Sequence, residues 1–543
     1  MYRQLLHSAR TARNSMQKFA EVRRYRATVA AAENVESQRI QNLEQKVRQE
    51  AASKPDNWDN AKPFSEIPGP KPLPLLGNMW RFIPIIGDFN GTDPIAFMTG
   101  FQKYGDIAAV RGFVKGDTVF LYKPEDIEAV FRNEGTWPER ISFKSIEYYQ
   151  ANVRKDIYDD LYSLVASNGK DWHKMRSIAN PILNQIRSVE MYIPEIDCVS
   201  QDFIKRIRFL LDNKEEGMMP ESFLNELNKW SLESVSFLGL DKRLGCLDSN
   251  LDPDSEAQKI IDSVHKMFEY MYKLEFEPSL LQYINTKNRD EFVKHFDVII
   301  NAFSKHIQEA KIRYENSSSE SNKSMLQRFL SVNEKVANVL ALDLLAAGVD
   351  TTGKSGGAIL YFLASHKRAQ NELRKELVTL LPNKDSPFTK ETLANAKYLK
   401  ASIKEGLRMG GIAVANVRTA TKDMVVGGYQ IPKGTLIQMC AYQNLFSEQQ
   451  FPHPREFIPE RWLRTNTSET SHKNTHPFVY LPFGFGARSC IGQRLATMEL
   501  ELLIARIIRN FELEWLHPPA KFTAKLFYEI VDPLRFKVKE TPE

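Results

Sequence analysis

The sequence predicts a mainly α protein with a minor β-sheet region, folded as a single large domain. Long segments with the periodicity of amphipathic helices dominate the 543 residues, and strand-like segments are few and short. Neither an internal repeat nor a second composition regime divides the chain, although its length alone allows three or four domains. Hydrophobic residues make up 42% and charged residues 26%, which excludes a disordered chain.

Residues 1–32 are predicted to be a mitochondrial transit peptide. They hold seven Arg and Lys residues against one acid, Glu21, so their net charge is +6, whereas the rest of the chain has a net charge of −1. Apolar residues such as Leu5 and Phe19 lie between the charges, and an Arg-rich, acid-poor segment of this kind is typical of import signals. The alternative is a basic helix that belongs to the fold.

Residues 33–62 are polar and are expected to be a linker that precedes one domain over residues 63–543. The Pro-rich stretch Ile67–Pro74 then predicts an extended, stiff arm. The sequence contains no run of 18 or more apolar residues, so no transmembrane helix is predicted and at most a peripheral membrane contact is expected. The total net charge of +5 is too small to indicate a nucleic-acid-binding protein.

Helices are expected along most of the folded part. Pro124, followed by two acids, starts a short helix. Longer amphipathic segments cover 200–212, 255–273, 289–313, 335–366, 391–409 and 493–511. The strand-like segments are Ile107–Val110 with Thr118–Tyr122, Met424–Ile431 and Leu526–Val538.

Cys490 lies in a glycine-rich loop directly before the last long helix. Glycines allow the backbone to approach a flat ligand closely, and the N–H groups at a helix start favour negative charge on a thiolate. Arg488 suits an anionic group beside the cysteine. The loop is therefore a candidate for a thiolate that binds a haem iron, with a buried, unreactive cysteine as the alternative.

The spacing Phe483-x-x-Gly486-x-Arg488-x-Cys490-x-Gly492 resembles the haem-binding loop of the cytochrome P450 family. The resemblance extends over about residues 65–540. It implies a haem domain that holds haem b (iron protoporphyrin IX), with Cys490 as the axial thiolate ligand and with Phe483 and Arg488 beside the cofactor.

Two further pairs of residues resemble structural and haem-binding motifs of that family. Glu405 and Arg408 share a helical face at i and i+3, and with Arg461 they match the ExxR triad, whose role is structural. Trp172 and Arg176, at i and i+4, match a helix that contacts a haem propionate. Arg418 matches another propionate contact by spacing alone. Taken singly, each arginine is more readily explained as a surface residue.

Residues 347–352 place Gly, Asp and Thr inside an apolar helical segment. These residues are poor helix formers, so a local opening of the helix is expected, or alternatively a helix end. The segment resembles the oxygen-binding motif of the family, which implies that Asp350 and Thr351 deliver protons during oxygen activation.

Lys400 and Lys404 stand at i and i+4 just before Glu405 and resemble the ferredoxin-docking lysines of animal mitochondrial P450s, with insect members as the nearest likeness. A solvated lysine face is the alternative. The resemblance implies that these lysines and Arg494 dock an acidic [2Fe–2S] ferredoxin. Since no GxGxxG follows a predicted strand, NAD(P)H is not expected to bind directly, and electrons are expected from a partner. The resemblance implies that they pass from NADPH through ferredoxin reductase and ferredoxin.

The expected activity is that of a monooxygenase on the matrix side of the inner mitochondrial membrane. It would insert one atom of O2 into a lipophilic small molecule, either a xenobiotic or a steroid-like compound. Candidate pocket positions by analogy are region 140–165, Leu344, Ile412, Val414 and the turn near Ile530. A haem-thiolate isomerase or dehydratase and a non-catalytic haem-binding protein are the alternatives.

Overall fold

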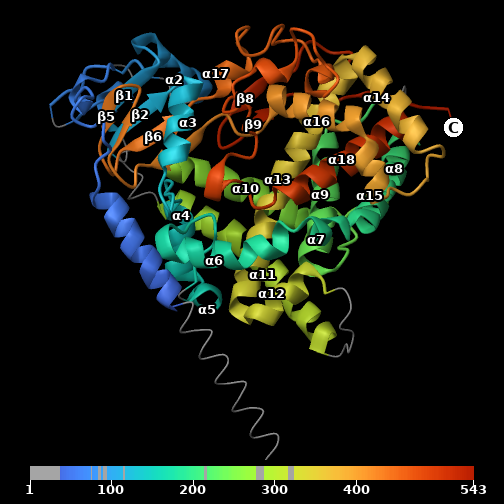
Figure 1. Cartoon of the computed structure of the whole chain (residues 1–543). Helices are drawn as coiled ribbons and strands as arrows, with labels where there is room; N and C mark the ends of the chain where they lie inside the picture. Colours follow the sequence, from blue (N-terminus) through green and yellow to red (C-terminus); the bar gives the residue numbers. More distant parts are fainter. Residues whose placement is uncertain are drawn as a thin grey trace, which may run out of the picture.

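The computed structural model describes residues 37–74, 76–82, 87–89, 94–113, 116–159, 161–212, 217–276, 286–315 and 323–542. In these parts of the chain, a large helical region adjoins a smaller region that carries the main sheet, which lies at the upper left of Figure 1. The predicted transit peptide falls outside the described residues. The predicted mainly helical architecture with minor sheets is confirmed.

The described β-structure consists of a four-stranded sheet and three two-stranded sheets. In the larger sheet, with the order β1-β2-β6-β3, only β2 and β6 are parallel. The small antiparallel sheets pair β4 with β5, β7 with β10, and β8 with β9. The strands are β1 (Ile107–Phe113), β2 (Gly116–Leu121), β3 (Asn416–Thr419), β4 (Met424–Val426), β5 (Tyr429–Ile431), β6 (Leu436–Met439), β7 (Phe511–Glu514), β8 (Phe522–Ala524), β9 (Tyr528–Ile530) and β10 (Lys537–Glu540).

The helices of the described residues follow the predicted periodic segments closely. One exception is segment 391–409, which is divided into two helices at Ala396. The helices are α2 (Pro94–Gly100), α3 (Pro124–Asn133), α4 (Lys144–Tyr148), α5 (Lys155–Tyr158), α6 (Gly169–Leu183), α7 (Ile186–Glu190), α8 (Ile193–Asp212), α9 (Phe223–Leu240), α10 (Glu256–Glu275), α11 (Thr286–Glu315), α12 (Met325–Val332), α13 (Glu334–Ser365), α14 (Lys367–Leu380), α15 (Lys390–Asn395), α16 (Lys397–Gly410), α17 (Tyr442–Leu445) and α18 (Gln493–Asn510).

The single strand expected over Leu526–Val538 is wrong. The chain forms β9, leaves the sheet, and returns as β10, which pairs with β7 instead. Pro533 lies between the two strands, and proline cannot donate a ladder hydrogen bond, so a continuous strand is disfavoured there.

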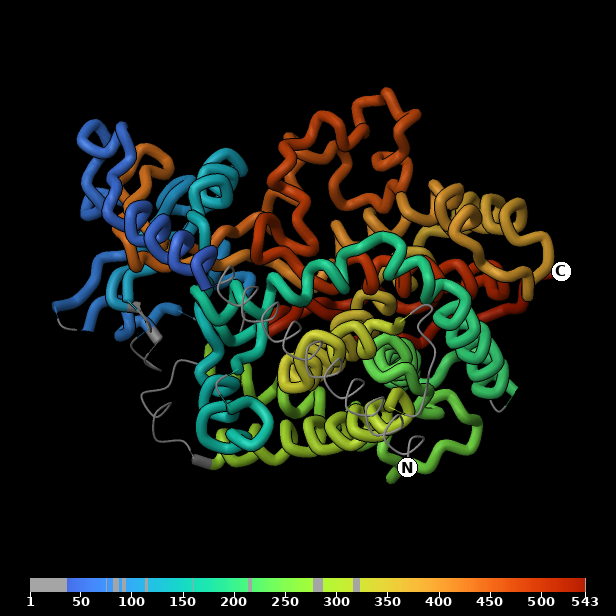
Figure 2. The backbone as a smooth tube through the Cα atoms, turned by 60° about the horizontal axis from the view of Figure 1, so that its bottom comes forward, coloured from blue at the N-terminus to red at the C-terminus, as the bar shows by residue number. Residues whose placement is uncertain are grey.

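Helix α13 passes through the middle of the helical region and packs against α9, α12, α16 and α18 (Figure 2). By length and composition it is the one described helix that could cross a membrane, yet 61% of its most apolar window is buried inside the protein. The expected opening near Gly348 is wrong, because α13 is continuous there. The Thr351 hydroxyl donates to the Ala347 carbonyl at 2.7 Å, and the Ser231 hydroxyl donates to the Gly348 carbonyl at 3.1 Å.

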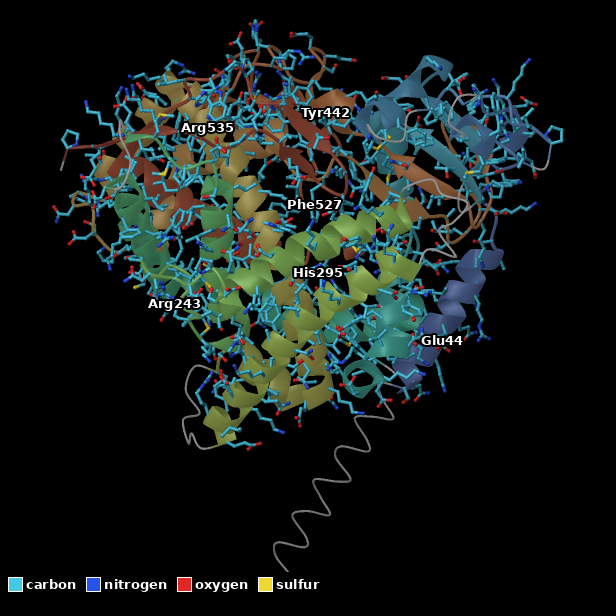
Figure 3. The ribbon with its side chains drawn as sticks, turned by 180° about the vertical axis from the view of Figure 1, so that it is seen from behind. Glu44, Arg243, His295, Tyr442, Phe527 and Arg535 are labelled. Carbon is cyan, nitrogen blue, oxygen red and sulfur yellow. The ribbon has the colours of Figure 1, made fainter. Side chains whose placement is uncertain are left out.

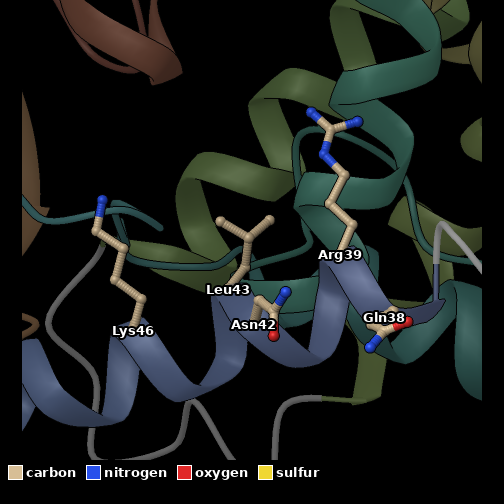
Figure 4. A pocket seen from close by; sticks show the side chains of 5 residues that line it. All are labelled: Gln38, Arg39, Asn42, Leu43 and Lys46. Carbon is tan, nitrogen blue, oxygen red and sulfur yellow. The ribbon is translucent and has the colours of Figure 1, made fainter.

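Residues 37–52 form a helix where the sequence predicted a polar linker. Leu43 and Val47 pack against the main core, and Glu50 accepts hydrogen bonds from the Thr136 backbone N and Oγ1 at 2.9 and 2.8 Å. Two apolar residues in a polar stretch are too weak a signal for a docked helix. Figure 4 shows a shallow surface pocket on this helix, lined by Gln38, Arg39, Asn42, Leu43 and Lys46.

Candidate functional site

The loop that carries Cys490 is held in a fixed shape directly before α18. The Cys490 backbone N donates to the Phe483 carbonyl at 2.8 Å, which closes the loop. Gly484 and Gly486 have φ values of 71° and 74°, in the region that favours glycine. A Cβ atom on Gly486 would also overlap Oε1 of Glu134. Backbone conformation therefore favours glycine at both positions, and at Gly486 the lack of space requires it as well.

The Cys490 thiol lies near positive charges, which are opposite in sign to the charge of a thiolate. Burial raises its pKa, while the Gly492 N–H and the positive charges of Arg176 and Arg140 act to lower it. Its residue lines a groove of about 680 Å³ that opens at the surface. A thiol in such surroundings becomes a stable thiolate when a metal ion binds it, because a bound cation deprotonates a coordinating thiol.

Four arginines, which we call the arginine cluster, lie close to one another, and two of them, Arg140 and Arg176, also act on Cys490. The cluster consists of Arg140, Arg176, Arg418 and Arg488. Burial and the charges of Arg418 and Arg176 lower the pKa of Arg140 to about 10. Burial and the three other guanidinium groups likewise lower the pKa of Arg488. Glu134 and Asp343 offset part of this positive charge, but four guanidinium groups packed together favour a further anionic partner.

Several donors around the arginine cluster lack a hydrogen-bond partner among the described residues. They are buried nitrogen atoms: Trp137 Nε1, Arg140 Nε, Arg176 Nε and Arg488 Nη1. Buried polar atoms are rarely left unpaired, since an unmade bond costs about 1–3 kcal/mol. A haem carries two negatively charged propionate groups. The positive charge and the free donors of the arginine cluster suit the binding of these groups.

Arg488 and Arg418 also bind the surrounding protein. The Arg488 guanidinium donates to the carbonyls of Pro138 and Ser167 at 2.8 and 3.0 Å. Arg418 Nε donates to Glu134 Oε2 at 2.6 Å, so this arginine already has a carboxylate partner. Of the arginines predicted to contact a propionate, Arg176 on α6 is thus more available than Arg418, which is already paired with Glu134.

Trp137 and Arg140 were missed by the sequence reasoning. They lie in an irregular segment between α3 and α4, far from Cys490 in the sequence. Only the folded chain brings Arg140 near Cys490, where each group shifts the pKa of the other. The Trp-Pro-Glu-Arg sequence itself offers no periodicity that would have revealed this.

A second cavity, of about 200 Å³, lies beside α13 and is called the distal cavity here. Thr351 lines it, and Phe527, labelled in Figure 3, contributes from the turn between β8 and β9. The other lining residues are mostly aromatic and aliphatic: Phe143, Ile146, Gln150, Ser163, Val165, Met267, Phe268, Met271, Phe296, Asp343, Ala346, Ala347 and Leu526.

The expected pocket positions agree with this cavity only in part. Region 140–165 contributes several lining residues, as expected. Leu344, Ile412 and Val414 are not among the lining residues, and neither is Ile530, because the turn contributes Leu526 and Phe527 instead. Such turn contacts depend on how β8 and β9 pair, which the sequence does not reveal.

Asp350 precedes Thr351 on α13 but its side chain is buried in an ionic network. Its Oδ1 lies 2.8 Å from His265 Nε2, and its Oδ2 lies 2.6 Å from Lys354 Nζ. Burial raises the pKa of Asp350, but the bonds from His265 and Lys354 outweigh it, and the net shift is downward. The His265 side chain, on α10, is 37% exposed, so the network reaches the surface. His265 was not predicted.

Glu405, Arg408 and Arg461 meet in the interior, each at most 1% exposed. Glu405 Oε1 lies 2.9 Å from Arg408 Nη2 and 3.1 Å from Arg461 Nε. Trp462 Nε1 also donates to Glu405, at 2.9 Å, while Arg408 donates to the Leu445 and Pro454 carbonyls. The network ties α16 to the irregular segment that precedes the Cys490 loop.

The predicted docking residues separate into two groups. Lys400 and Arg494 line the groove that also contains Cys490, together with Lys390. Lys404 is not among the lining residues, and its ammonium lies 5.7 Å from the centre of the Trp462 ring. Burial, together with Arg464 and Lys400, lowers the pKa of Lys404.

Comparison with known proteins identifies the family. The model of the family "Cytochrome P450" matches residues 67–533. A Drosophila melanogaster protein named probable cytochrome P450 12a5, mitochondrial, is 38% identical over 501 residues, which cover 89% of this chain and 92% of that protein. Cytochrome P450 CYP12A2 of Musca domestica is 38% identical over 497 residues, covering 88% of this chain and 91% of its own.

A third relative, probable cytochrome P450 301a1, mitochondrial, of Drosophila melanogaster, is 37% identical over 490 residues, covering 89% of this chain and 88% of its own. The predicted resemblance to insect mitochondrial P450s is thereby confirmed. Members of the family hold a haem through a cysteine thiolate. This chain belongs to the cytochrome P450 family and is a haem-thiolate monooxygenase.

Proposed function

We propose that this enzyme is a mitochondrial monooxygenase that inserts one oxygen atom from O2 into a lipophilic small molecule. Electrons come from NADPH through ferredoxin reductase and a [2Fe–2S] ferredoxin, on the matrix side of the inner membrane. The observation that carries the proposal is the buried set of unpaired donors around the arginine cluster, next to the Cys490 thiol. Two of the relatives named above are described as mitochondrial.

On the cysteine side, Cys490 would supply the thiolate that binds the haem iron. Arg140, Arg176 and Arg488 would hold the haem propionates with the nitrogen atoms that are otherwise unpaired. When bound, a haem with a thiolate ligand would provide the electron density that favours cleavage of the O–O bond of dioxygen. The Gly492 N–H directs its dipole at the Cys490 sulfur and helps to keep it negative.

On the substrate side, the distal cavity holds a lipophilic molecule and excludes water. Thr351 Oγ1 lies at its wall and carries a proton that it donates to the Ala347 carbonyl. Asp350 is proposed to receive protons from solvent through His265, whose Nε2 lies 2.8 Å from Asp350 Oδ1. The proton then passes toward Thr351, its neighbour on α13.

Ferredoxin is proposed to dock at the groove that contains Cys490. Lys390, Lys400 and Arg494 give this groove cationic side chains, although Glu190 and Glu501 also line it. Attraction between these cations and an acidic ferredoxin would accelerate association and would weaken at high salt. Lys404 contributes less to the docking face, because its ammonium lies over Trp462.

The test is a reconstituted reaction with purified ferredoxin and ferredoxin reductase. Substrates are first selected from steroid precursors and lipophilic xenobiotics by the spectral change of the haem on binding. With labelled O2, the product should contain one labelled oxygen atom and should form only when NADPH and ferredoxin are both present. A product that forms in the absence of ferredoxin and ferredoxin reductase, and that carries no labelled oxygen, would instead identify an isomerase or a dehydratase.

A further inference from the structure

Besides Thr351 and Ser163, two polar residues, Asp343 and Gln150, line the mostly apolar distal cavity, and neither has a role in the proposed mechanism. Asp343 comes from α13, and Gln150 comes from a short π-helical turn, Tyr149–Val153. Short π-helical segments are often found at functional sites. A polar pair of this kind in a lipophilic pocket usually fixes the orientation of a ligand.

Asp343 is held firmly in place. Its Oδ2 accepts a hydrogen bond from the Leu164 backbone N at 2.7 Å. Burial raises its pKa to about 7, although the bonds from Leu164 and Ser163 and the charge of Arg140 act in the opposite direction. The carboxyl group is thus fixed in the cavity wall, where its ionised form can accept a hydrogen bond from a ligand.

Gln150 offers the complementary donor. Its side chain is buried, at 1% exposure, and its Oε1 accepts a hydrogen bond from the Ser163 backbone N at 3.4 Å. Its Nε2 is buried and makes no hydrogen bond of good geometry within the described part of the chain, although the Gln150 side chain approaches the Tyr158 hydroxyl and lowers its pKa. Because a buried amide donor costs free energy when it is unpaired, this atom calls for an acceptor from a ligand.

Asp343 and Gln150 lie close together. Both are fastened to the same two consecutive residues, Ser163 and Leu164. Both also act on the buried Tyr158 hydroxyl: burial and the charge of Asp343 raise its pKa, and Gln150 lowers it. An acceptor and a donor thus occupy one end of the cavity.

We propose that the substrate is a neutral lipophilic alcohol, whose hydroxyl group donates a hydrogen bond to Asp343 and accepts one from Gln150. This inference rests on the proposed monooxygenase function and names its substrate class. A hydroxyl is the small group that can both donate and accept. An ammonium group cannot accept from Gln150, and it would also face the charge of Arg140, while a carboxylate would be repelled by Asp343.

The anchor is remote from the reacting end of the cavity. Asp343 and Thr351 are eight residues apart on α13, which corresponds to roughly 12 Å along the helix axis. A substrate fixed by its hydroxyl at Asp343 would therefore present carbon atoms distant from that hydroxyl to Thr351. Oxygen should be inserted far from the existing hydroxyl, giving a diol with widely separated hydroxyl groups.

The first experiment uses the wild-type holoenzyme and compares four probes of equal length: 1-decanol, decane, decanoate and decyltrimethylammonium. Dissociation constants come from the spectral change of the haem on titration, or from competition with a haem-ligating imidazole. Two hydrogen bonds predict that 1-decanol binds about tenfold more tightly than decane. Equal affinity for alcohol and hydrocarbon, or a preference for the ammonium or the carboxylate probe, would overturn the proposal.

The second experiment removes each polar group separately. Gln150→Leu and Asp343→Leu should each lower the affinity for 1-decanol several-fold while leaving that for decane nearly unchanged. Asp343→Asn and Gln150→Met are milder variants in case the leucine variants fail to fold, and Asp343→Asn should retain most of the preference for the alcohol. Gln443→Leu is the matched control, since this glutamine also lacks partners among the described residues but does not line the cavity.

The reduced, CO-treated spectrum of every protein distinguishes a failure of the proposed monooxygenase function from a failure of the proposed substrate class. A wild-type protein without the thiolate-haem band would refute the proposed function and this inference with it. A wild-type protein with the band, combined with an alcohol preference that Gln150→Met and Asp343→Leu leave unchanged, would refute the inference alone.

Discussion

Arg488 lies over the indole ring of Trp172, with its guanidinium carbon 4.1 Å from the ring centre. The contact joins the Cys490 loop to α6, two parts of the chain that the proposed haem would also contact. It orients Arg488 within the arginine cluster, and a cation over a Trp face is worth about 0.5–2 kcal/mol. The Trp172 ring thus positions Arg488, which is a proposed propionate contact.

Trp172→Leu should therefore lower the haem content of the purified enzyme, because Arg488 loses the surface on which it rests. Trp172→Phe keeps an aromatic face and should retain more haem than the leucine variant. Haem per protein, determined after extraction into pyridine, measures the effect. Equal haem content in the two variants would show that the ring face does not support Arg488.

Arg140→Gln and Arg176→Gln should have opposite effects on the apo-enzyme and the haem-loaded enzyme. In the apo-enzyme, removal of one positive charge relieves repulsion within the arginine cluster and should raise the midpoint of thermal unfolding. In the loaded enzyme, the same change removes a propionate partner and should lower that midpoint. Shifts of the same sign in both forms would contradict the assignment of these arginines to an anionic ligand.

Glu499 on α18 should make the enzyme less stable as the pH rises toward 8. Burial raises the pKa of Glu499 to about 8, whereas an unfolded glutamate titrates near 4.3. Between these values the folded state binds a proton that the unfolded chain has released, so stability falls as pH increases through this window. Glu499→Gln should flatten the decline in thermal midpoint between pH 6 and pH 8.

Glu469→Gln provides the control for that measurement, because its side chain is 77% exposed. It should leave the pH profile of the thermal midpoint as it is in the wild type. A Glu499→Gln profile that is as steep as those of the wild type and the control would show that Glu499 does not hold a proton in the folded state.

The network of His265 and Asp350 should affect turnover without affecting substrate binding. Asp350→Asn removes the proposed proton donor to Thr351 and should lower kcat about 100-fold, within the usual range for general acid–base groups. His265→Ala should lower kcat about tenfold, because it interrupts the contact at 2.8 Å through which Asp350 reaches the surface. A rise in KM with kcat unchanged would instead indicate that the network shapes the pocket.

The features that the sequence predicts well are local. Glu405 and Arg408 are one helical turn apart, so their pairing follows from helix geometry alone. The Cys490 loop is likewise recognisable from glycines and charges within ten consecutive residues. The main helices are predicted for the same reason, since their amphipathic periodicity is a property of each segment by itself.

The features that escape prediction depend on contacts between distant segments. His265 reaches Asp350 only because α10 packs against α13, and Glu50 reaches Thr136 only because helix 37–52 docks against the segment that follows α3. Gln150 and Asp343 likewise meet only through Ser163 and Leu164. Nothing in the spacing of these residues along the chain indicates that they lie together.

The most direct test of the account is the reduced, CO-treated spectrum of the wild type beside those of Cys490→Ala and Cys440→Ala. Cys440 is a matched control because it is a buried cysteine whose pKa is also raised by burial. The account predicts the thiolate-haem band in the wild type and in Cys440→Ala, and its complete loss in Cys490→Ala. A band that persists unchanged in Cys490→Ala would contradict the assignment of Cys490 as the ligand of the haem iron.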